Sequence, residues 1–122
     1  MSKINIKVTI QNEENTTTCQ TQAILQDNLL KYQEEEDTMV IYDYENNTLL
    51  RENSELKMNY SFSRGEKTTG EIIIKELKRR MPIEINTKSI EKEKNNILVE
   101  FLIDNQTFIY KVEEIIWVFL KN

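Results

Sequence analysis

Short runs of alternating apolar and polar residues extend through nearly the whole chain. In the two clearest runs, the apolar positions are Leu56, Met58, Tyr60 and Phe62, followed later by Ile97, Val99, Phe101 and Ile103. Successive side chains of a β-strand point to opposite faces of a sheet, so this two-residue period predicts half-buried antiparallel strands.

Polar segments divide these runs and predict about ten strands. The strands are expected at residues 4–10, 17–25, 29–33, 38–44, 48–52, 56–62, 68–74, 97–103 and 106–112, and the tail over residues 113–120 fits either a closing strand or a short helix. The pairs Asp27-Asn28, Asn46-Asn47 and Asp104-Asn105 mark tight turns, because Asn and Asp tolerate the left-handed backbone that such turns require.

The segment after Gly70 fits two interpretations. Residues 71–80 have apolar side chains at helical spacing, but the β-branched run from Ile72 to Ile74 favours a strand, and Pro82 prevents a helix from continuing. We therefore predict a strand that ends at Ile74, followed by an irregular bend at residues 77–81. Gly65 is expected in a turn with positive φ, and Gly70 at a bulge or a close approach of two backbones.

The spacing of the strands indicates the architecture. Strands at intervals of about 8–12 residues with polar turns are typical of an all-β sandwich or barrel. Because the connections are short, sequence neighbours should pair in an up-and-down meander, and closure of that meander into a barrel removes its exposed edges. We predict a single domain over residues 1–122, an antiparallel up-and-down β-barrel of about 8–10 strands, with a sandwich as the alternative.

Composition narrows the possible functions. The chain has no histidine, one cysteine and a net charge of −5, so it lacks the commonest general base and metal ligand and cannot form an internal disulfide. The acidic balance argues against a nucleic acid or an anionic membrane as partner. We see no secretory leader, membrane-spanning run or glycine-rich phosphate loop. We therefore expect a cytoplasmic, non-enzymatic protein without metal or cofactor.

Tyrosines and one arginine are the candidate ligand-binding residues. On barrel strands, Tyr42, Arg51, Tyr60 and Tyr110 could line an interior cavity and offer hydroxyl groups and one charge as polar anchors. Core packing explains the tyrosines equally well, and large side chains could fill the barrel and leave no cavity. The side chains large enough to do so are Phe62, Phe101, Phe108 and Trp117.

The C-terminal run from Ile115 to Leu120 is apolar on both faces. It either packs on the barrel mouth or docks on a partner, in which case Ile116, Trp117 and Phe119 are the expected contacts. Two charged clusters, the acidic run at residues 34–37 and the basic residues within 75–80, are interpreted as solvated surface.

Several segments from Leu50 onward carry a family resemblance. They are Leu50-Arg51, Met58 to Phe62 with Arg64-Gly65, Thr69 to Ile72, Met81 to Thr87, and Asn96 to Phe101. They resemble the YwiB-like family of small bacterial calycin-type β-barrel proteins, a family without assigned function. The resemblance implies a calycin- or lipocalin-like barrel, related in shape to pockets that hold small apolar ligands. It implies no activity and no catalytic residues. One segment departs from the family pattern. In the family, the residues before the glycine are rich in aromatic side chains, whereas this chain has Lys67, Thr68 and Thr69 before Gly70.

Three functional hypotheses follow. The leading one is a binding module for a small apolar or amphipathic ligand, held by burial and one or two polar anchors. The alternative is a structural or interaction protein that forms a homodimer or binds a protein partner through its C-terminal run. An enzyme is the third, and it would require a cavity that pairs Arg51 with a carboxylate of raised pKa.

Overall fold

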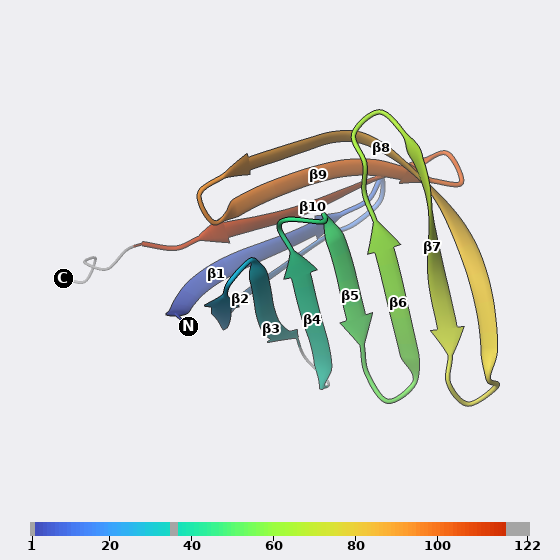
Figure 1. Cartoon of the computed structure of the whole chain (residues 1–122), viewed down its shortest axis with the longest axis horizontal. Coiled ribbons are helices and arrows are strands. Elements are labelled where there is room, and N and C mark those ends of the chain that lie inside the picture. The colour runs from blue at the N-terminus through green and yellow to red at the C-terminus, as the bar shows by residue number, and fades with distance from the viewer. Residues whose placement is uncertain (1, 35–36, 117–122) are drawn as a thin grey trace.

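The described part of the chain, residues 2–34 and 37–116, consists of ten antiparallel strands that close into a barrel in this computed structural model (Figure 1). The strands are β1 (Ser2–Gln11), β2 (Thr16–Gln26), β3 (Leu29–Glu34), β4 (Thr38–Asp43), β5 (Thr48–Glu52), β6 (Leu56–Ser61), β7 (Lys67–Ile74), β8 (Arg79–Glu93), β9 (Asn96–Ile103) and β10 (Gln106–Glu114).

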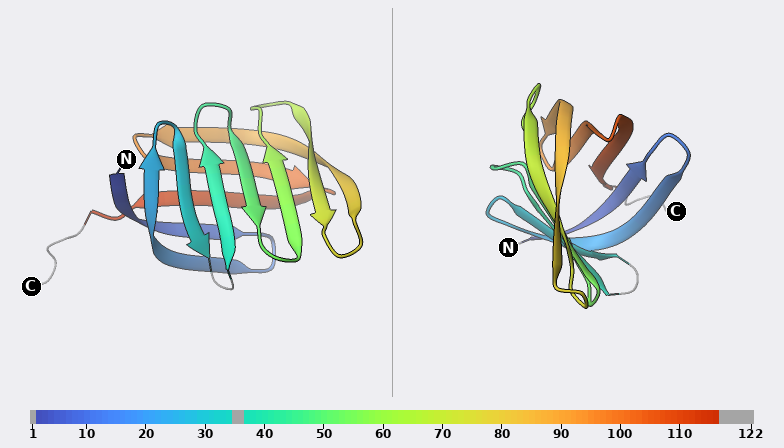
Figure 2. Two further views of the ribbon diagram at one scale, coloured as in Figure 1. Left: turned by 60° about the horizontal axis from the view of Figure 1, so that its bottom comes forward. Right: turned by 90° about the vertical axis from the view of Figure 1, so that its right-hand side faces the viewer.

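Each strand pairs with its neighbours in sequence, and β1 pairs with β10 to close the barrel. The prediction of an all-β, antiparallel up-and-down barrel is therefore confirmed. Figure 2 shows that β3 to β6 cross steeply over the layer formed by β8, β9, β10 and β1. The long strand β8 belongs to both layers, because its first half pairs with β7 and its second half with β9.

The prediction for the segment after Ile74 is wrong in two respects. The bend at residues 77–81 ends earlier than predicted, and no strand was predicted over residues 82–93, where most of β8 lies. The turn ends at Lys78, which has a φ of 51°, and β8 begins at Arg79 and continues through Pro82. Proline lacks a backbone N–H and is confined to places where no ladder hydrogen bond is needed. From Arg79 to Ile85 the strand pairs only with β7, so the missing donor of Pro82 can face an unpaired edge.

Turn residues behave as their chemistry predicts. Asp27, Asn47, Asp104 and Asn105 all have positive φ, and the last two form the tight turn between β9 and β10. Gly65 also has positive φ. At Gly70 the constraint is space, because a Cβ atom there would lie 2.5 Å from the carbonyl oxygen of Asn59 on β6. The predicted close approach at Gly70 is therefore confirmed.

The core consists of the inward-facing side chains of the strands, together with Phe62 just after β6. The buried apolar side chains are Ile6, Val8, Ala23, Leu30, Tyr32, Val40, Tyr42, Leu49, Phe62, Ile85, Ile90, Ile97, Val99, Phe101, Tyr110 and Val112. Phe101 contacts both Phe62 and Phe108, with ring centroids 4.8 and 5.6 Å apart. These rings fill part of the interior, as the sequence suggested, and Trp117 lies outside the described residues.

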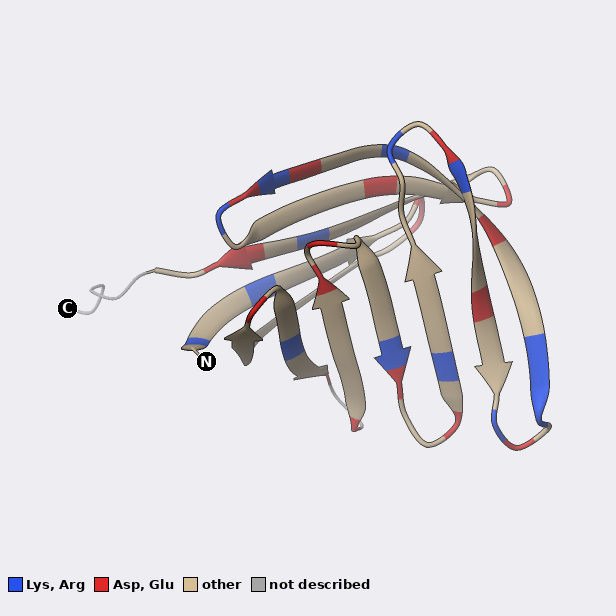
Figure 3. Ribbon diagram, in the orientation of Figure 1, with Lys and Arg blue, Asp and Glu red and all other residues tan. Residues whose placement is uncertain are grey.

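Charged side chains of both signs are interspersed over the strands and turns (Figure 3). In the basic cluster, Lys75 pairs with Glu52 at 2.8 Å and Arg80 with Glu71 at 3.2 Å. Such pairs are typical of a charge-balanced surface. No helix that could cross a membrane occurs within the described residues.

Candidate ligand cavity

The barrel wall separates between β2 and β3. These strands pair only where Ile24 to Gln26 meets Leu29 to Lys31. Beyond this short ladder, β2 stays paired with β1 and β3 stays paired with β4, so β2 and β3 diverge. A cavity of about 470 Å³ lies at this separation, and we call it the threonine cavity. It is lined by Val8, Ile10, Thr17, Thr18, Cys19, Glu34, Thr38 and Arg51.

Two charged residues occupy positions that face the interior. On β3, Glu34 shares a face with the buried residues Leu30 and Tyr32. On β5, Arg51 shares a face with buried Leu49 and is opposite Val40 of β4. Since side chains alternate along a strand, both charges point into the barrel near the end of the strands that carry them.

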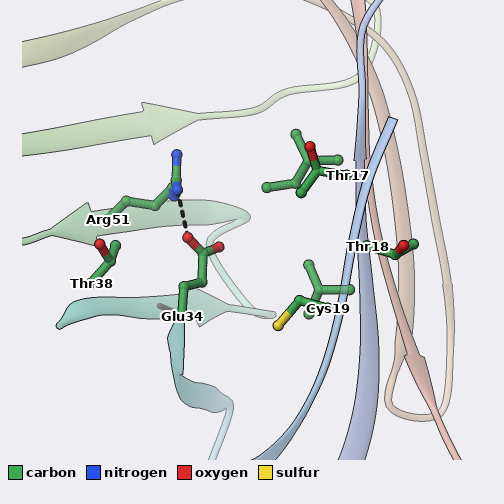
Figure 4. A pocket seen from close by; sticks show the side chains of 8 residues that line it. Thr17, Thr18, Cys19, Glu34, Thr38 and Arg51 are labelled. Carbon is green, nitrogen blue, oxygen red and sulfur yellow. Dashed lines mark hydrogen bonds and ion pairs between the residues drawn. The ribbon is translucent and has the colours of Figure 1, made fainter. Parts of the chain in front are cut away.

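Arg51 and Glu34 form an ion pair in the cavity (Figure 4). Arg51 Nη2 donates to Glu34 Oε1 at 2.5 Å, and the two side chains are 28% and 16% exposed. Burial tends to lower the pKa of the Arg51 guanidinium, but the hydrogen bond and charge of Glu34 outweigh it, so this pKa lies above its usual value. Arg51 is therefore held in its charged form.

The Nε atom of Arg51 is buried and has no hydrogen-bond partner among the described residues. Buried polar groups are normally satisfied, and an unsatisfied N–H is a place where a bound molecule can supply an acceptor. In Figure 4, Thr17 and Cys19 of β2 lie on the far side of the cavity from the ion pair, and Thr38 lies beside Arg51.

A second cavity adjoins the first. It has a volume of about 180 Å³ and is lined by Ile10, Leu49, Arg51, Tyr60, Phe101, Ile103, Phe108, Ile109 and Tyr110. We call it the aromatic cavity. Ile10 and Arg51 line both cavities, so a mostly apolar space and a threonine-rich space meet at the arginine. Burial raises the pKa of Tyr60 and, further, that of Tyr110, so both phenols stay protonated and can donate.

A pair of buried phenols lies across the barrel, from β3 to β10. The hydroxyl oxygens of Tyr32 and Tyr110 are 2.7 Å apart. Tyr42 stacks on Tyr110, with ring centroids 5.8 Å apart, and it is fully buried. Tyr42 is thus a core residue that supports the ring of Tyr110.

The structure brings together three of the four predicted ligand-binding residues. Arg51, Tyr60 and Tyr110 line the aromatic cavity, whereas Tyr42 lies in the core and lines neither cavity. Of the residues predicted to contact a partner at the C-terminus, Ile116 is 76% exposed and lines neither cavity. Trp117 and Phe119 lie outside the described residues.

Sequence reasoning missed the role of Glu34. We interpreted the acidic run that it begins as a solvated turn, yet Glu34 is the last residue of β3 and is mostly buried. The sequence did contain a signal for this burial, because Glu34 continues the alternation of Leu30 and Tyr32 on the inward face of the strand. Cys19 is half-buried and lines the threonine cavity. The described residues contain no group of Cys, Asp and Glu side chains that could hold a metal ion.

The fold and cavity define a small all-β protein, an up-and-down barrel that opens between two of its strands. A similar solved structure is that of the YwiB protein from Bacillus subtilis, with a TM-score of 0.58 and 17% sequence identity. The match covers 93% of this chain and 91% of that chain, which confirms the predicted YwiB-like fold. No protein-family model and no curated protein matches the chain.

Proposed function

We propose that this protein is a non-enzymatic, cytoplasmic binding module that holds a small amphipathic molecule in the two adjoining cavities. One observation carries the proposal: a mostly apolar cavity and a threonine-rich cavity meet at the charged side chain of Arg51. Ligand sites in proteins are concave, mostly apolar, and contain a few polar groups that orient the ligand. Calycin-like barrels provide the structural analogy, which concerns shape alone.

The lining favours binding over catalysis. Arg51 and Glu34 are paired with each other, and the remaining polar groups of the two linings are hydroxyls and one thiol. The chain has no histidine to act as a general base near neutral pH. The aromatic cavity would bury the apolar part of the ligand, and the threonine cavity would receive its polar end.

The proposal is tested with Nile red, a neutral dye whose fluorescence rises in apolar surroundings. Ile10 lines both cavities, so Ile10→Phe should obstruct the place where they meet. The matched control is Ile4→Phe, which lies on the same strand and face but lines neither cavity. We expect Ile10→Phe to weaken dye binding about tenfold or more and Ile4→Phe to leave it nearly unchanged.

Circular dichroism of both variants verifies that the barrel is intact. Equal dye affinity in wild type and in a folded Ile10→Phe variant would contradict the proposal. Native mass spectrometry of protein purified from a bacterial cytosol supplies a second readout, because a retained natural ligand adds a discrete mass that is lost on denaturation.

A second candidate function is association through the C-terminal end. The supporting observation is that Ile116, two residues beyond the end of β10, is 76% exposed. The sequence continues this exposed side chain into an apolar run that ends at Leu120, and apolar runs of this kind are typical of protein interfaces. Sedimentation velocity of wild type and Ile116→Lys tests this candidate: a dimer that the substitution dissociates would support it, and a monomer at every concentration would contradict it.

A further inference from the structure

The inference concerns the head group of the ligand and rests on the proposed function. We infer that the cavity selects an uncharged head group that accepts hydrogen bonds, such as an alcohol or a primary amide, over a carboxylate. Two observations support this selectivity: hydrogen-bond donors in the cavity that have no acceptor, and the charges of Arg51 and Glu34, which neutralise each other.

The first argument is the supply of donors. Arginine has five N–H donors and no acceptor. Arg51 uses one Nη2 donor for Glu34, while its buried Nε has no partner within the described ranges. Tyr110, which lines the aromatic cavity, adds another donor when Tyr32 donates the hydrogen bond that joins the two hydroxyls, because the proton of Tyr110 is then left over. A ligand that satisfies these groups must supply an acceptor.

The second argument is charge. Arg51 and Glu34 are the charged side chains, among the described residues, that line the two cavities, and they neutralise each other at 2.5 Å. A carboxylate bound at Arg51 would place a second negative charge close to Glu34 in a partly desolvated site. Like charges repel strongly there, because the effective dielectric constant is well below that of water.

A neutral acceptor avoids this repulsion. Its oxygen can accept from Arg51 while the ion pair stays intact. An alcohol or a primary amide also has a proton to donate, and Glu34 has a second oxygen, Oε2, that does not participate in the ion pair. The threonine hydroxyls both donate and accept, so they fit either kind of head group. Glu34 therefore acts as a specificity-determining residue.

The test compares three ligands with the same apolar chain: octanol, octanamide and octanoate. Isothermal titration calorimetry measures their affinities for wild type, for Glu34→Gln and for Glu100→Gln. The last variant is the matched control, because Glu100 on β9 changes the net charge equally but lines neither cavity. Gln is close in shape to Glu, so both variants are expected to fold. The comparison of the three ligands on wild type tests the inference even without the variants.

We expect wild type to bind octanol and octanamide about tenfold or more tightly than octanoate. Glu34→Gln should strengthen octanoate binding by about tenfold and leave octanol within about threefold, because Arg51 then has an unneutralised charge. Glu100→Gln should leave all three affinities unchanged.

The contrary outcomes are distinct. If wild type prefers octanoate, or if Glu100→Gln strengthens octanoate binding as much as Glu34→Gln does, the inference is overturned while the binding function stands. If none of the three ligands nor Nile red binds, the proposed function fails and the inference fails with it.

Discussion

The hydroxyl oxygens of Tyr32 on β3 and Tyr110 on β10 lie 2.7 Å apart in the core, although the two tyrosines are 78 positions apart in the chain. Both residues are buried, and Tyr110 also lines the aromatic cavity. This contact connects the two crossing layers of the barrel by a polar interaction next to the proposed ligand site. It leads to a prediction about stability.

Removal of the hydroxyl of Tyr32 or of Tyr110 alone should cost more than half of the stability that is lost when both hydroxyls are removed. In Tyr32→Phe or Tyr110→Phe, the partner's hydroxyl stays buried without its hydrogen bond, and the expected loss in free energy of unfolding is about 1–3 kcal/mol. In the double variant no hydroxyl is stranded, so the loss should be smaller than the sum of the two single losses. Urea denaturation of the four proteins measures this coupling. Strictly additive losses would mean that the two hydroxyls do not interact.

Alkaline pH should unfold the protein because its tyrosines are buried in the protonated form. Burial raises the pKa of Tyr44 to about 12, from an ordinary value of 10.0. The unfolded chain loses this phenolic proton at lower pH than the folded chain does. The contribution of Tyr44 to stability is therefore complete below about pH 10 and is lost as pH rises through about 12.

Tyr44→Phe isolates this contribution. The variant removes the titrating group, together with the 2.6 Å hydrogen bond that the hydroxyl donates to the carbonyl oxygen of Asn95. Its free energy of unfolding should be lower at neutral pH and should fall less steeply between about pH 10 and 12 than that of wild type. Denaturant titrations at a series of pH values give both slopes. An unchanged slope would contradict the raised pKa of Tyr44.

Gly70 should tolerate no side chain, for reasons of space and not of backbone angle. A methyl group at this position would meet the carbonyl oxygen of Asn59 at 2.5 Å, and neither backbone can retreat without disturbing the β6–β7 ladder. We expect Gly70→Ala to lower the free energy of unfolding by about 1–3 kcal/mol. Thermal unfolding followed by circular dichroism measures the loss.

Gly65→Ala is the control for that substitution. Gly65 has a φ of 74° and open space around the position of a Cβ atom, so alanine there meets only the cost of a left-handed backbone. That cost is about 1–2 kcal/mol. A near-wild-type stability of Gly70→Ala would show that the carbonyl oxygen of Asn59 lies further from Gly70 than the 2.5 Å contact indicates.

Local chemistry in the sequence was sufficient to predict most strands and turns. Alternation such as that from Ile97 to Ile103 requires one buried face, which a strand in a half-buried sheet provides. Asp104 and Asn105 accept positive φ, so they end one strand and begin the next within a tight turn. These patterns depend only on residues that are close in sequence, so they can be recognised without a tertiary structure.

Pro82 shows where local signals fail. From the sequence, Pro82 served to exclude a continuing helix, and the residues before it were predicted to form a bend. Proline within a strand is unfavourable only when a ladder hydrogen bond is lost. Only the register shows that β9 ends before it reaches Pro82, which leaves this part of β8 with β7 as its one neighbour. Whether a backbone donor is needed depends on the presence of another strand, and no local pattern contains that information.

The sequence by itself determined an all-β meander with tyrosines and Arg51 on inward-facing positions. Only the tertiary structure decided that Tyr42 supports the core, that Arg51 pairs with Glu34, and that β2 and β3 separate after a short ladder to form a cavity. The physical reason is that alternation specifies which face of a strand is buried, since it arises from each strand's own residues. Which buried side chains meet, and where the wall opens, depends on strand register and on the crossing of the two layers.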